Sequence, residues 1–229
     1  MMKLALRALP IALLTWVNSP AWADDVPNNT VRLGWYWVSF HSFASDLSGP
    51  YVPDGTSLDV RAVQTPYFAY LRRLSPHFTA ELAVGVPPIT KSYGQGPSTL
   101  GSVPYNNVEI STARWFSPTA LLEYVFFDED AAVRPYFGVG VNYTKFYDSN
   151  STPAGNAASG GPTSINLPSS TGPAATVGLS YHWHRWSAIV SYSESRVRTQ
   201  VTTNTEGVLR TASISFNPSP IVVAVGYSF

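Results

Sequence analysis

The sequence predicts an all-β fold: an eight-stranded antiparallel transmembrane β-barrel with short periplasmic turns and long extracellular loops. Eight segments alternate bulky apolar side chains with small or polar ones, and the connections between them alternate between short and long. Only 12% of the 229 residues are charged, which is about half the usual share for a soluble domain. Because soluble proteins cover their surface with charged side chains, we expect lipid to cover much of this one.

The first 23 residues predict a secretory signal peptide. Lys3 and Arg7 precede an apolar run, and Ala21-Trp22-Ala23 supplies a small-x-small cleavage site. Residues 24–229 are then expected to form a single barrel domain. Removing Lys3 and Arg7 from 14 basic and 14 acidic residues leaves a net charge of −2, which offers no electrostatic attraction for nucleic acid. The chain has no cysteine, and no stretch after residue 23 is long and apolar enough for a membrane helix.

The first four strands are expected at residues 30–40, 64–74, 78–86 and 118–127. The first two alternate least regularly. In the third, Leu82 and Val84 lie on the face opposite Glu81, and in the fourth Leu122 and Tyr124 lie opposite Glu123. Each of these strands therefore has one apolar face and one face that carries the polar side chains.

The last four strands are expected at residues 134–148, 174–183, 186–193 and 221–229. In the final one, Val223, Val225, Tyr227 and Phe229 share a face, and neither face carries a charge. A soluble barrel would expose charges on its outer face, so we expect the bulky side chains to face lipid and the small ones a narrow lumen. Tyr227 and Phe229 would then lie in the periplasmic aromatic girdle, as a candidate assembly signal through which the C-terminal strand contacts the barrel-assembly machinery.

The connections set the expected orientation. Short ones lie at residues 75–77, 128–130 and 184–185, and long ones near 41–63, 88–113, 148–173 and 199–212. Short periplasmic turns and long external loops are typical of outer-membrane barrels, so we expect the protein in the bacterial cell outer membrane. Residues 151–173 are so rich in Gly, Pro and Ser that we expect a mobile loop.

Residues 134–144, RPYFGVGVNYT, resemble the segment RPYxGxGxNYT of the outer-membrane protein W (OmpW) family. Arg32-x-Gly34, Glu81-Leu82 followed by Pro87, Ser117-Pro118-Thr119 and Gly226-Tyr227-x-Phe229 are further matches, so the resemblance extends over nearly all of the mature chain. Two departures stand near the third and fourth strands: the family's LPPTL reads FSPTA at residues 116–120, and Pro87-Pro88 replaces a single proline.

The resemblance implies an eight-stranded barrel with a narrow, largely apolar interior that is linked to the passage of small hydrophobic compounds. Some relatives serve hydrocarbon uptake, and others are receptors for bacteriocins or phage. Two functions therefore stay open: a passive channel for small hydrophobic solutes, with lateral release into the membrane, or a structural or surface-receptor barrel that binds through its loops. The expected partners are outer-membrane lipid and lipopolysaccharide, together with the solute, and no cofactor is expected.

Four charged residues are predicted to point into the lumen near its periplasmic end: Arg32, Glu81, Glu123 and Arg134. An eight-stranded barrel is just wide enough for side chains to fill, and buried charges must be paired. We expect an ion network that blocks the lower lumen, with a purely structural role as the alternative.

Pro87, Pro88 and Pro118 are a candidate lateral exit, because proline cannot donate to the strand ladder and weakens the wall. The alternative is that these prolines stand where pairing already ends. A candidate hydrophobic funnel comprises Trp35, Trp37, Phe40, Phe43, Trp115 and Phe116, although aromatic residues gather at both interfaces of any such barrel.

Catalysis is not expected. His77 and His184 fall in predicted turns, which leaves His41 as the one histidine near the outer rim, and no G-x-S-x-G motif is present. His182 and His184 share a strand face but lack a third ligand at suitable spacing, so no metal site is predicted.

Overall fold

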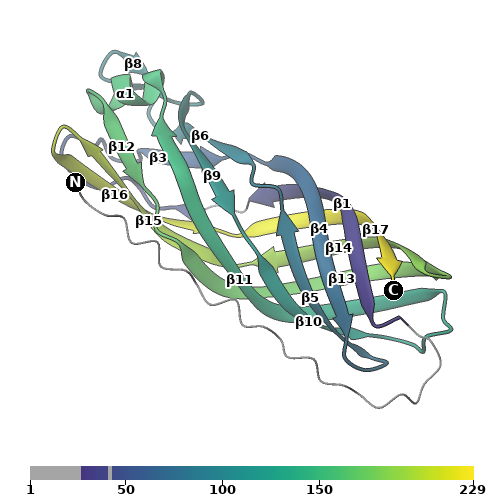
Figure 1. The fold of residues 1–229 in the computed structure, drawn as a ribbon. Coiled ribbons are helices and arrows are strands. Elements are labelled where there is room, and N and C mark those ends of the chain that lie inside the picture. Colours follow the sequence, from purple (N-terminus) through teal and green to yellow (C-terminus); the bar gives the residue numbers. More distant parts are fainter. Residues whose placement is uncertain (1–26, 41–42) are drawn as a thin grey trace, which may run out of the picture.

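The computed structural model describes residues 27–40 and 43–229, so the predicted signal peptide at residues 1–23 lies outside the described part of the chain. Eight antiparallel strands close into a barrel (Figure 1). They are β1 (Asn29–Phe40), β4 (Val63–Arg73), β5 (Phe78–Gly85), β10 (Thr119–Val125), β11 (Val133–Ser151), β13 (Ser170–Trp183), β14 (Trp186–Ser195) and β17 (Pro218–Ser228). Pairing of β10 with β11, and of β1 with β17, completes the ring, which confirms the predicted fold.

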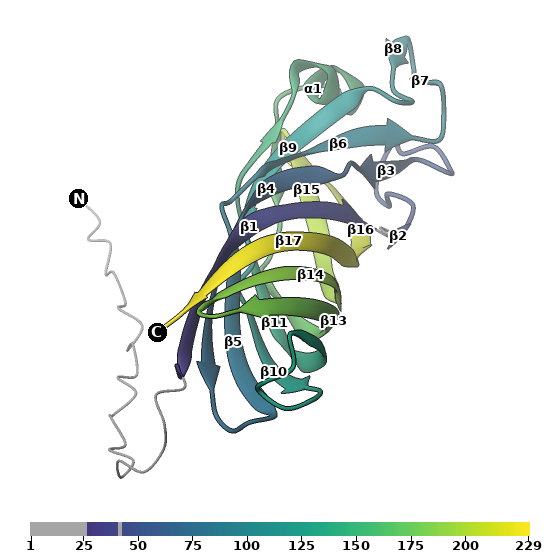
Figure 2. The same cartoon turned by 90° about the vertical axis from the view of Figure 1, so that its right-hand side faces the viewer.

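The predicted alternation of faces is confirmed. Bulky apolar side chains cover the outside of the barrel wall: Val139 and Val225 remain 58% and 46% exposed. Their neighbours Gly138, Ala224 and Gly226 face the lumen, where a Cβ at either glycine would meet side chains of the adjacent strands. Figure 2 shows β4, β1, β17 and β14 side by side in this wall.

One end of the barrel, which we call the turn end, carries short connections and the C-terminal residue. Residues 74–77, 126–132 and 184–185 join its strands; each includes a predicted short connection, at 75–77, 128–130 and 184–185. Asn29 and Phe229 exchange two backbone hydrogen bonds there, at 3.1 and 2.9 Å, so the last residue is paired in the wall. No helix in the described part of the chain has the length and apolarity needed to cross a membrane.

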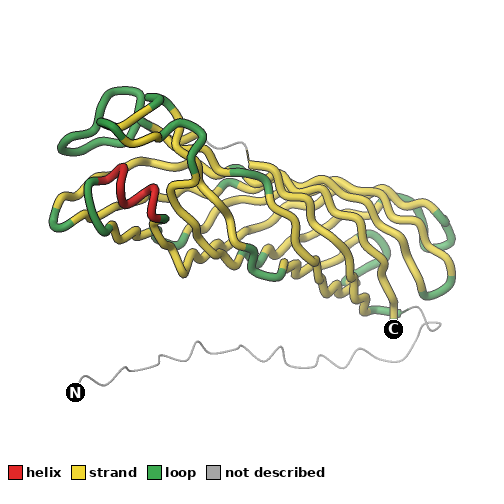
Figure 3. The backbone as a smooth tube through the Cα atoms, turned by 90° about the horizontal axis from the view of Figure 1, so that it is seen from above, coloured by secondary structure: helices red, strands yellow, loops and turns green. Residues whose placement is uncertain are grey.

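The opposite end, the loop end, is built of strands where the sequence predicted loops. We call this part the cap. It contains β2 (Phe43–Ala44), β3 (Ser57–Val60), β6 (Ile89–Gln95), β7 (Thr99–Leu100), β8 (Val103–Pro104), β9 (Glu109–Phe116), β12 (Thr163–Asn166), β15 (Val197–Thr205), β16 (Val208–Phe216) and the last part of β11. Figure 3 shows the barrel strands running into it.

The β15–β16 hairpin turns through Glu206 and Gly207, whose φ angles of 50° and 94° are both positive. Two successive positive φ angles fit the right-handed twist of a tight hairpin, and glycine adopts them without strain. Asn204 Oδ1 accepts a hydrogen bond from the Gly207 backbone N–H at 2.8 Å. The hairpin thereby extends the wall well past the end of the barrel.

Residues 151–173, where the sequence predicted a mobile loop, contain a helix, strand β12 and the first residues of β13. Helix α1 (Pro153–Ser159) begins after Thr152, whose side chain accepts from Gly155 N–H, and it ends at Gly160 in the left-handed conformation. An N-cap threonine, a proline in the first turn and a C-terminal glycine are the residues that delimit a helix. A proline and a glycine of this Gly-, Pro- and Ser-rich segment thus mark the two ends of the helix.

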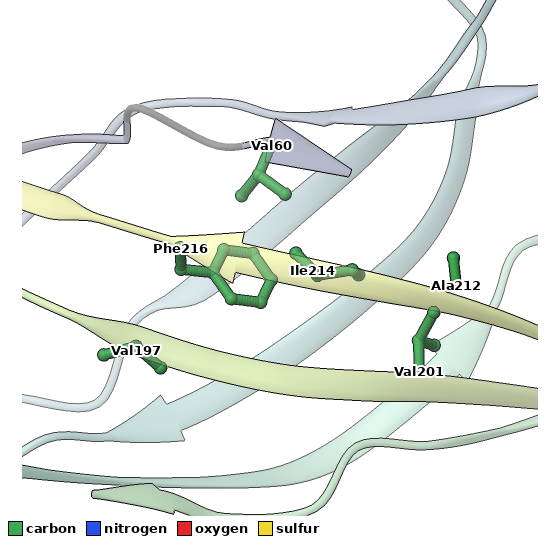
Figure 4. Packing of buried hydrophobic residues seen from close by; sticks show 6 residues of the cluster. All are labelled: Val60, Val197, Val201, Ala212, Ile214 and Phe216. Atoms are coloured by element: carbon green, nitrogen blue, oxygen red, sulfur yellow. The ribbon is translucent and has the colours of Figure 1, made fainter. Parts of the chain in front are cut away.

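Two buried apolar clusters hold the molecule together. The cap cluster joins β3, β15 and β16 through Val60, Val197, Val201, Ala212, Ile214 and Phe216, and Figure 4 shows Val60 opposite Phe216 and Ile214. The lumen cluster comprises Tyr67, Ala69, Leu71, Ala83, Val222 and Ala224. The first cluster lies above the membrane-spanning wall and the second lies within it.

Candidate functional site

The cap encloses a cavity of about 140 Å³. Its walls come from segments far apart in the sequence, including β3, β9, β15 and β16, and the cap cluster forms part of its surface. Apolar side chains dominate, and most of the polar ones are the hydroxyls of serine and threonine. A cavity of this size and lining is large enough for one benzene-sized molecule.

Four aromatic rings lie where the barrel passes into the cap: Phe40, Trp115, Phe146 and Phe216. Phe40 meets Trp115 and Phe216 edge to face, with centroids 6.2 and 6.3 Å apart, and Phe146 lies 5.7 Å from Phe216. All four line the cavity. They give its lower part an aromatic surface, which we call the aromatic floor.

The funnel predicted from the sequence is only partly found in this position. Phe40 and Trp115 line the cavity, but Trp35 and Trp37 are each 41% exposed on the outer face of β1, and Phe116 is exposed on that of β9. The side chain of Phe43 lies outside the described part of the structure. Because Arg32 points inward, the two-residue period already requires Trp35 and Trp37 to point outward.

Phe146 and Phe216 were absent from the predicted funnel. Phe146 continues the inward face of Asn142 and Thr144 along β11, and Phe216 shares its face with Ala212 and Ile214. The alternation in residues 208–216 is weak, because Arg210 shares a face with Ala212, Ile214 and Phe216. The sequence predicted a loop near residues 199–212 and the next strand only from residue 221.

Below the aromatic floor the lumen narrows. A second cavity of about 40 Å³ lies inside the barrel and is lined by Tyr36, Tyr67, Glu81 and neighbouring small residues. Tyr36 and Tyr67 pack edge to face with centroids 4.8 Å apart. This space suits a water molecule or two, and is too small for a ring.

An ion cluster lies inside the barrel, on the side of the turn end. Arg32 Nη1 lies 2.7 Å from Glu81 Oε2 and 3.6 Å from Glu123 Oε1. Tyr67 donates its hydroxyl to Glu81 Oε1 at 2.9 Å. The three charged residues are predicted lumen residues, and the structure brings them together from β1, β5 and β10.

Aromatic packing holds the guanidinium in place. The Arg32 Cζ atom lies 5.3 Å from the centroid of the Tyr136 ring, within the range of a cation–π contact. The other side of that ring lies against β13 at Gly178, where an added Cβ would come within 2.4 Å of Tyr136 Cζ. Glycine at position 178 is therefore required for the tyrosine to lie across the lumen.

Arg134 does not join this cluster. Its Nη2 donates to the carbonyl oxygens of Pro76 and Phe127, at 3.0 and 3.2 Å, so it links two turns at the turn end. Arg134 is the second residue of β11 and lies next to the turn. Its guanidinium contacts the turn carbonyls, and it forms no ion pair with Glu81 or Glu123. We correct its predicted role from network member to a tie between turns.

The three prolines flank an interruption in the wall. Between the third and fourth barrel strands, the last registered pair of β5 and β10 is Ala83–Thr119, and the next pair upward is Ile89–Arg114 of β6 and β9. Residues 84–88 and 115–118 form no registered pair across this boundary, which we call the seam. Pro87, Pro88 and Pro118 all lie in it.

The seam borders the cavity. Thr90, Trp115 and Ser117 line the cavity next to it, and Trp115 Nε1 donates across it to Thr90 Oγ1 at 2.7 Å. The two chain segments that border the seam remain hydrogen-bonded to their other neighbours, β4 and β11. Val86 N–H donates to Pro66 O, and Tyr143 N–H donates to Pro118 O. The interruption is therefore confined to one inter-strand boundary at the height of the aromatic floor.

The histidines lie apart from the cavity where they are described. His77 Nδ1 contacts the Val125 carbonyl at 3.1 Å, and His182 Nε2 contacts Ser180 Oγ at 2.9 Å. His41 lies outside the described residues. Within residues 27–40 and 43–229, no group of three or more His, Cys, Asp or Glu side chains is arranged to hold a metal ion.

Comparison with known proteins gives consistent results. The OmpW family profile matches residues 67–229. The chain is 30% identical over 122 residues to outer membrane protein W of Vibrio cholerae, covering 53% of this chain and 55% of that protein. It is 32% identical over 132 residues to the dibenzothiophene metabolism operon protein PahQ of Pseudomonas aeruginosa, covering 57% and 58%. The chain thus spans a little over half the length of the curated relatives it matches.

Solved structures share the fold. The outer membrane protein OprG of Pseudomonas aeruginosa superposes with a TM-score of 0.79 at 20% identity, over 89% of this chain and 96% of that one. AlkL in lipid bilayers gives 0.63 at 20% identity, over 93% and 95% of the two chains, and outer membrane protein W of E. coli gives 0.55 at 22%, over 89% and 98%.

Proposed function

Because the chain belongs to the OmpW family and is an outer-membrane β-barrel, we propose that it mediates passive passage of small hydrophobic molecules from the loop end, with lateral release into lipid. The observation that carries the proposal is an apolar cavity placed above a filled lumen. A solute in this cavity has no open route of its own size toward the turn end. It must return to the outside or leave through the wall.

The seam is the exit that fits this requirement best. It borders the cavity at Trp115 and Ser117, and it lacks the backbone hydrogen bonds that seal the rest of the wall. Opening it breaks side-chain contacts such as the Trp115–Thr90 hydrogen bond, and no strand pairing. Proline at 87, 88 and 118 supports this role because it offers no N–H to close the ladder.

The cavity lining supports a small apolar solute. The aromatic floor offers ring surfaces for edge-to-face and stacked contacts with an aromatic guest. The name of one relative, a dibenzothiophene metabolism operon protein, refers to an aromatic compound. We infer transport without catalysis, since the serine and threonine hydroxyls around the cavity lack a nearby base among the described residues.

Two partners follow from the barrel itself. Its outer apolar face contacts membrane lipid, and we infer that lipopolysaccharide surrounds it in the outer leaflet. We also infer that β17 contacts the barrel-assembly machinery through Tyr227 and Phe229, both of which point outward with 39% and 52% exposure. Outward aromatic side chains at the last strand remain accessible until the barrel is embedded.

Uptake by lipid vesicles tests the transport proposal. Vesicles with the wild-type protein should take up a toluene-sized tracer faster than protein-free vesicles. Ala113→Phe, which projects a ring into the cavity from β9, should reduce that rate severalfold. Ala120→Phe makes the same change on the lipid face of β10 and should leave uptake intact.

The same experiment separates the alternative function. A surface receptor without transport would show equal uptake with and without protein, and Ala113→Phe would have no effect. Binding of bacteriocin or phage to the cap would then be the activity to measure.

A further inference from the structure

Arg210 is the one charged residue among the described residues that line the cavity, whose other members are apolar or carry uncharged polar groups. It lies on the inward face of β16, in line with Ala212, Ile214 and Phe216 of the cap cluster. The residue is 8% exposed and lines the cavity. A buried cation on this face needs a physical reason, because burying an unpaired charge costs free energy.

The hydrogen bonds of Arg210 hold it in position without neutralising it. Nε donates to Pro50 O at 3.1 Å, Nη1 to Thr205 Oγ1 at 3.2 Å, and Nη2 to Ser159 O at 3.4 Å. All three acceptors are uncharged. A guanidinium has five N–H donors, so one remains on each terminal nitrogen.

No carboxylate compensates its charge within the described part of the chain. The ion pairs found there involve Arg32, Arg73, Lys91 and Arg114, and none involves Arg210. Glu206, four residues earlier, is exposed in the hairpin turn and takes part in none of these ion pairs. Arg32, by contrast, is buried to the same degree and faces two carboxylates.

We propose that Arg210 binds the carboxylate of a small aromatic acid, of benzoate size, whose ring occupies the cavity. The proposal rests on the proposed function and defines its solute more closely. A carboxylate accepts two parallel hydrogen bonds from the terminal nitrogens of a guanidinium, and each of these nitrogens has one free N–H. Val201 and Ala212, an adjacent pair on β15 and β16, line the cavity beside Arg210, and the volume of about 140 Å³ favours a single ring there.

This arrangement would select by charge as well as by size. A benzoate gains a charge-assisted hydrogen bond in a poorly solvated site, where such bonds are strongest. The isosteric neutral amide gains less, and a benzylammonium ion meets a like charge. A preference for the anionic ligand thus distinguishes binding at Arg210 from simple partition of apolar molecules into an apolar cavity.

Calorimetric titration of the full chain in lipid nanodiscs tests the proposal, with benzoate, benzamide and benzylamine as probes. Benzoate should bind at least about tenfold more tightly than benzamide, and benzylamine should not bind. Arg210→Gln should remove the preference for benzoate, while Arg210→Lys should keep part of it. Arg198→Gln, at an exposed position on the neighbouring strand, should bind as the wild type does.

Equal affinity of the wild type for benzoate and benzamide would overturn the proposal, and this comparison requires no variant to fold. An unchanged preference in folded Arg210→Gln would overturn it as well. Failure of the proposed transport function gives a different result, in which neither the neutral nor the anionic probe binds or enters vesicles.

Discussion

Arg32 and Glu81 form an ion pair of 2.7 Å inside the barrel although 49 residues separate them in the sequence. The strand between theirs, β4, adds Tyr67 to the same carboxylate, and β10 adds Glu123. Side chains of four consecutive barrel strands thus meet inside the lumen. Such a buried cluster should be sensitive to the loss of any one member.

Arg32→Met should lower the free energy of unfolding by about 3–5 kcal/mol, because Glu81 and Glu123 would remain buried without a cation. The triple variant Arg32→Met/Glu81→Gln/Glu123→Gln removes all three charges and should recover most of the loss. Urea unfolding in lipid vesicles measures both values. A single variant that costs less than about 1 kcal/mol would mean that water reaches the cluster.

The ion cluster should also limit conductance. Wild-type protein in planar bilayers should conduct ions poorly, and Glu81→Ala or Glu123→Ala should raise single-channel conductance severalfold by opening space in the filled lumen. Glu129→Ala removes an exposed carboxylate at the turn end and provides the matched control. Large wild-type currents that these substitutions leave unchanged would rule out a blocking role.

Closing the seam should slow lateral release. Pro87→Val together with Pro118→Val restores two backbone donors and two β-forming side chains, so vesicle uptake of the hydrophobic tracer should fall severalfold. Pro66→Val, in a strand that is already paired on both sides, should have little effect. Undiminished uptake in the double variant would count against release at this position.

Val139 tests the lipid-facing orientation. It lies midway along the barrel part of β11 and is 58% exposed, so Val139→Arg should destabilise the embedded protein by about 2–4 kcal/mol. Val133→Arg, on the same face at the turn end, should cost at most about 1 kcal/mol, since depth in the bilayer sets the penalty. Equal, small costs would mean that water contacts both positions.

Tyr105 gives the cap a predicted alkaline limit. Burial raises the pKa of Tyr105 to about 12, and its hydroxyl donates to Ser57 O at 2.7 Å. The pKa of Tyr105 is higher in the folded chain than in the unfolded chain. The stabilisation that its protonated hydroxyl gives the cap is therefore complete below pH 10 and is lost as pH rises toward 12. In the wild type, amide protection of residues 57–60 against hydrogen exchange should fall over this pH range. Tyr105→Phe should abolish that pH dependence, while the barrel amides keep the wild-type profile.

The barrel could be predicted from the sequence because each wall strand has a bulky face and a small one, and this period of two admits few alternatives. The convergence of Arg32, Glu81 and Glu123 followed from their inward parity and their nearness to the same end. Arg134 also points inward, but it lies next to its turn. Its guanidinium donates to carbonyl oxygens of two turns and to no carboxylate of the ion cluster.

The cap could not be anticipated in the same way, because its pairings join residues distant in sequence and its strands are rich in threonine and serine. Residues 197–205 and 208–216 have a weaker alternation than the wall, since water covers their outer side and polar residues occur on both faces. Arg210 therefore gave no signal by itself. Only the neighbours that bury it, from the β2–β3 connection and α1, show that it faces a cavity.

Strand β11 spans 19 residues from the turn end into the cap, pairing first with β10 and β13 and then with β9 and β12, with one register shift against β9 between Tyr147 and Asn150. The upper and lower halves of the molecule therefore share this strand as a covalent and hydrogen-bonded connection. A chimera that joins the cap of one relative to the barrel of another should therefore take the whole of β11 from one parent. A junction inside β11 must keep the inward and outward alternation of both parents in register.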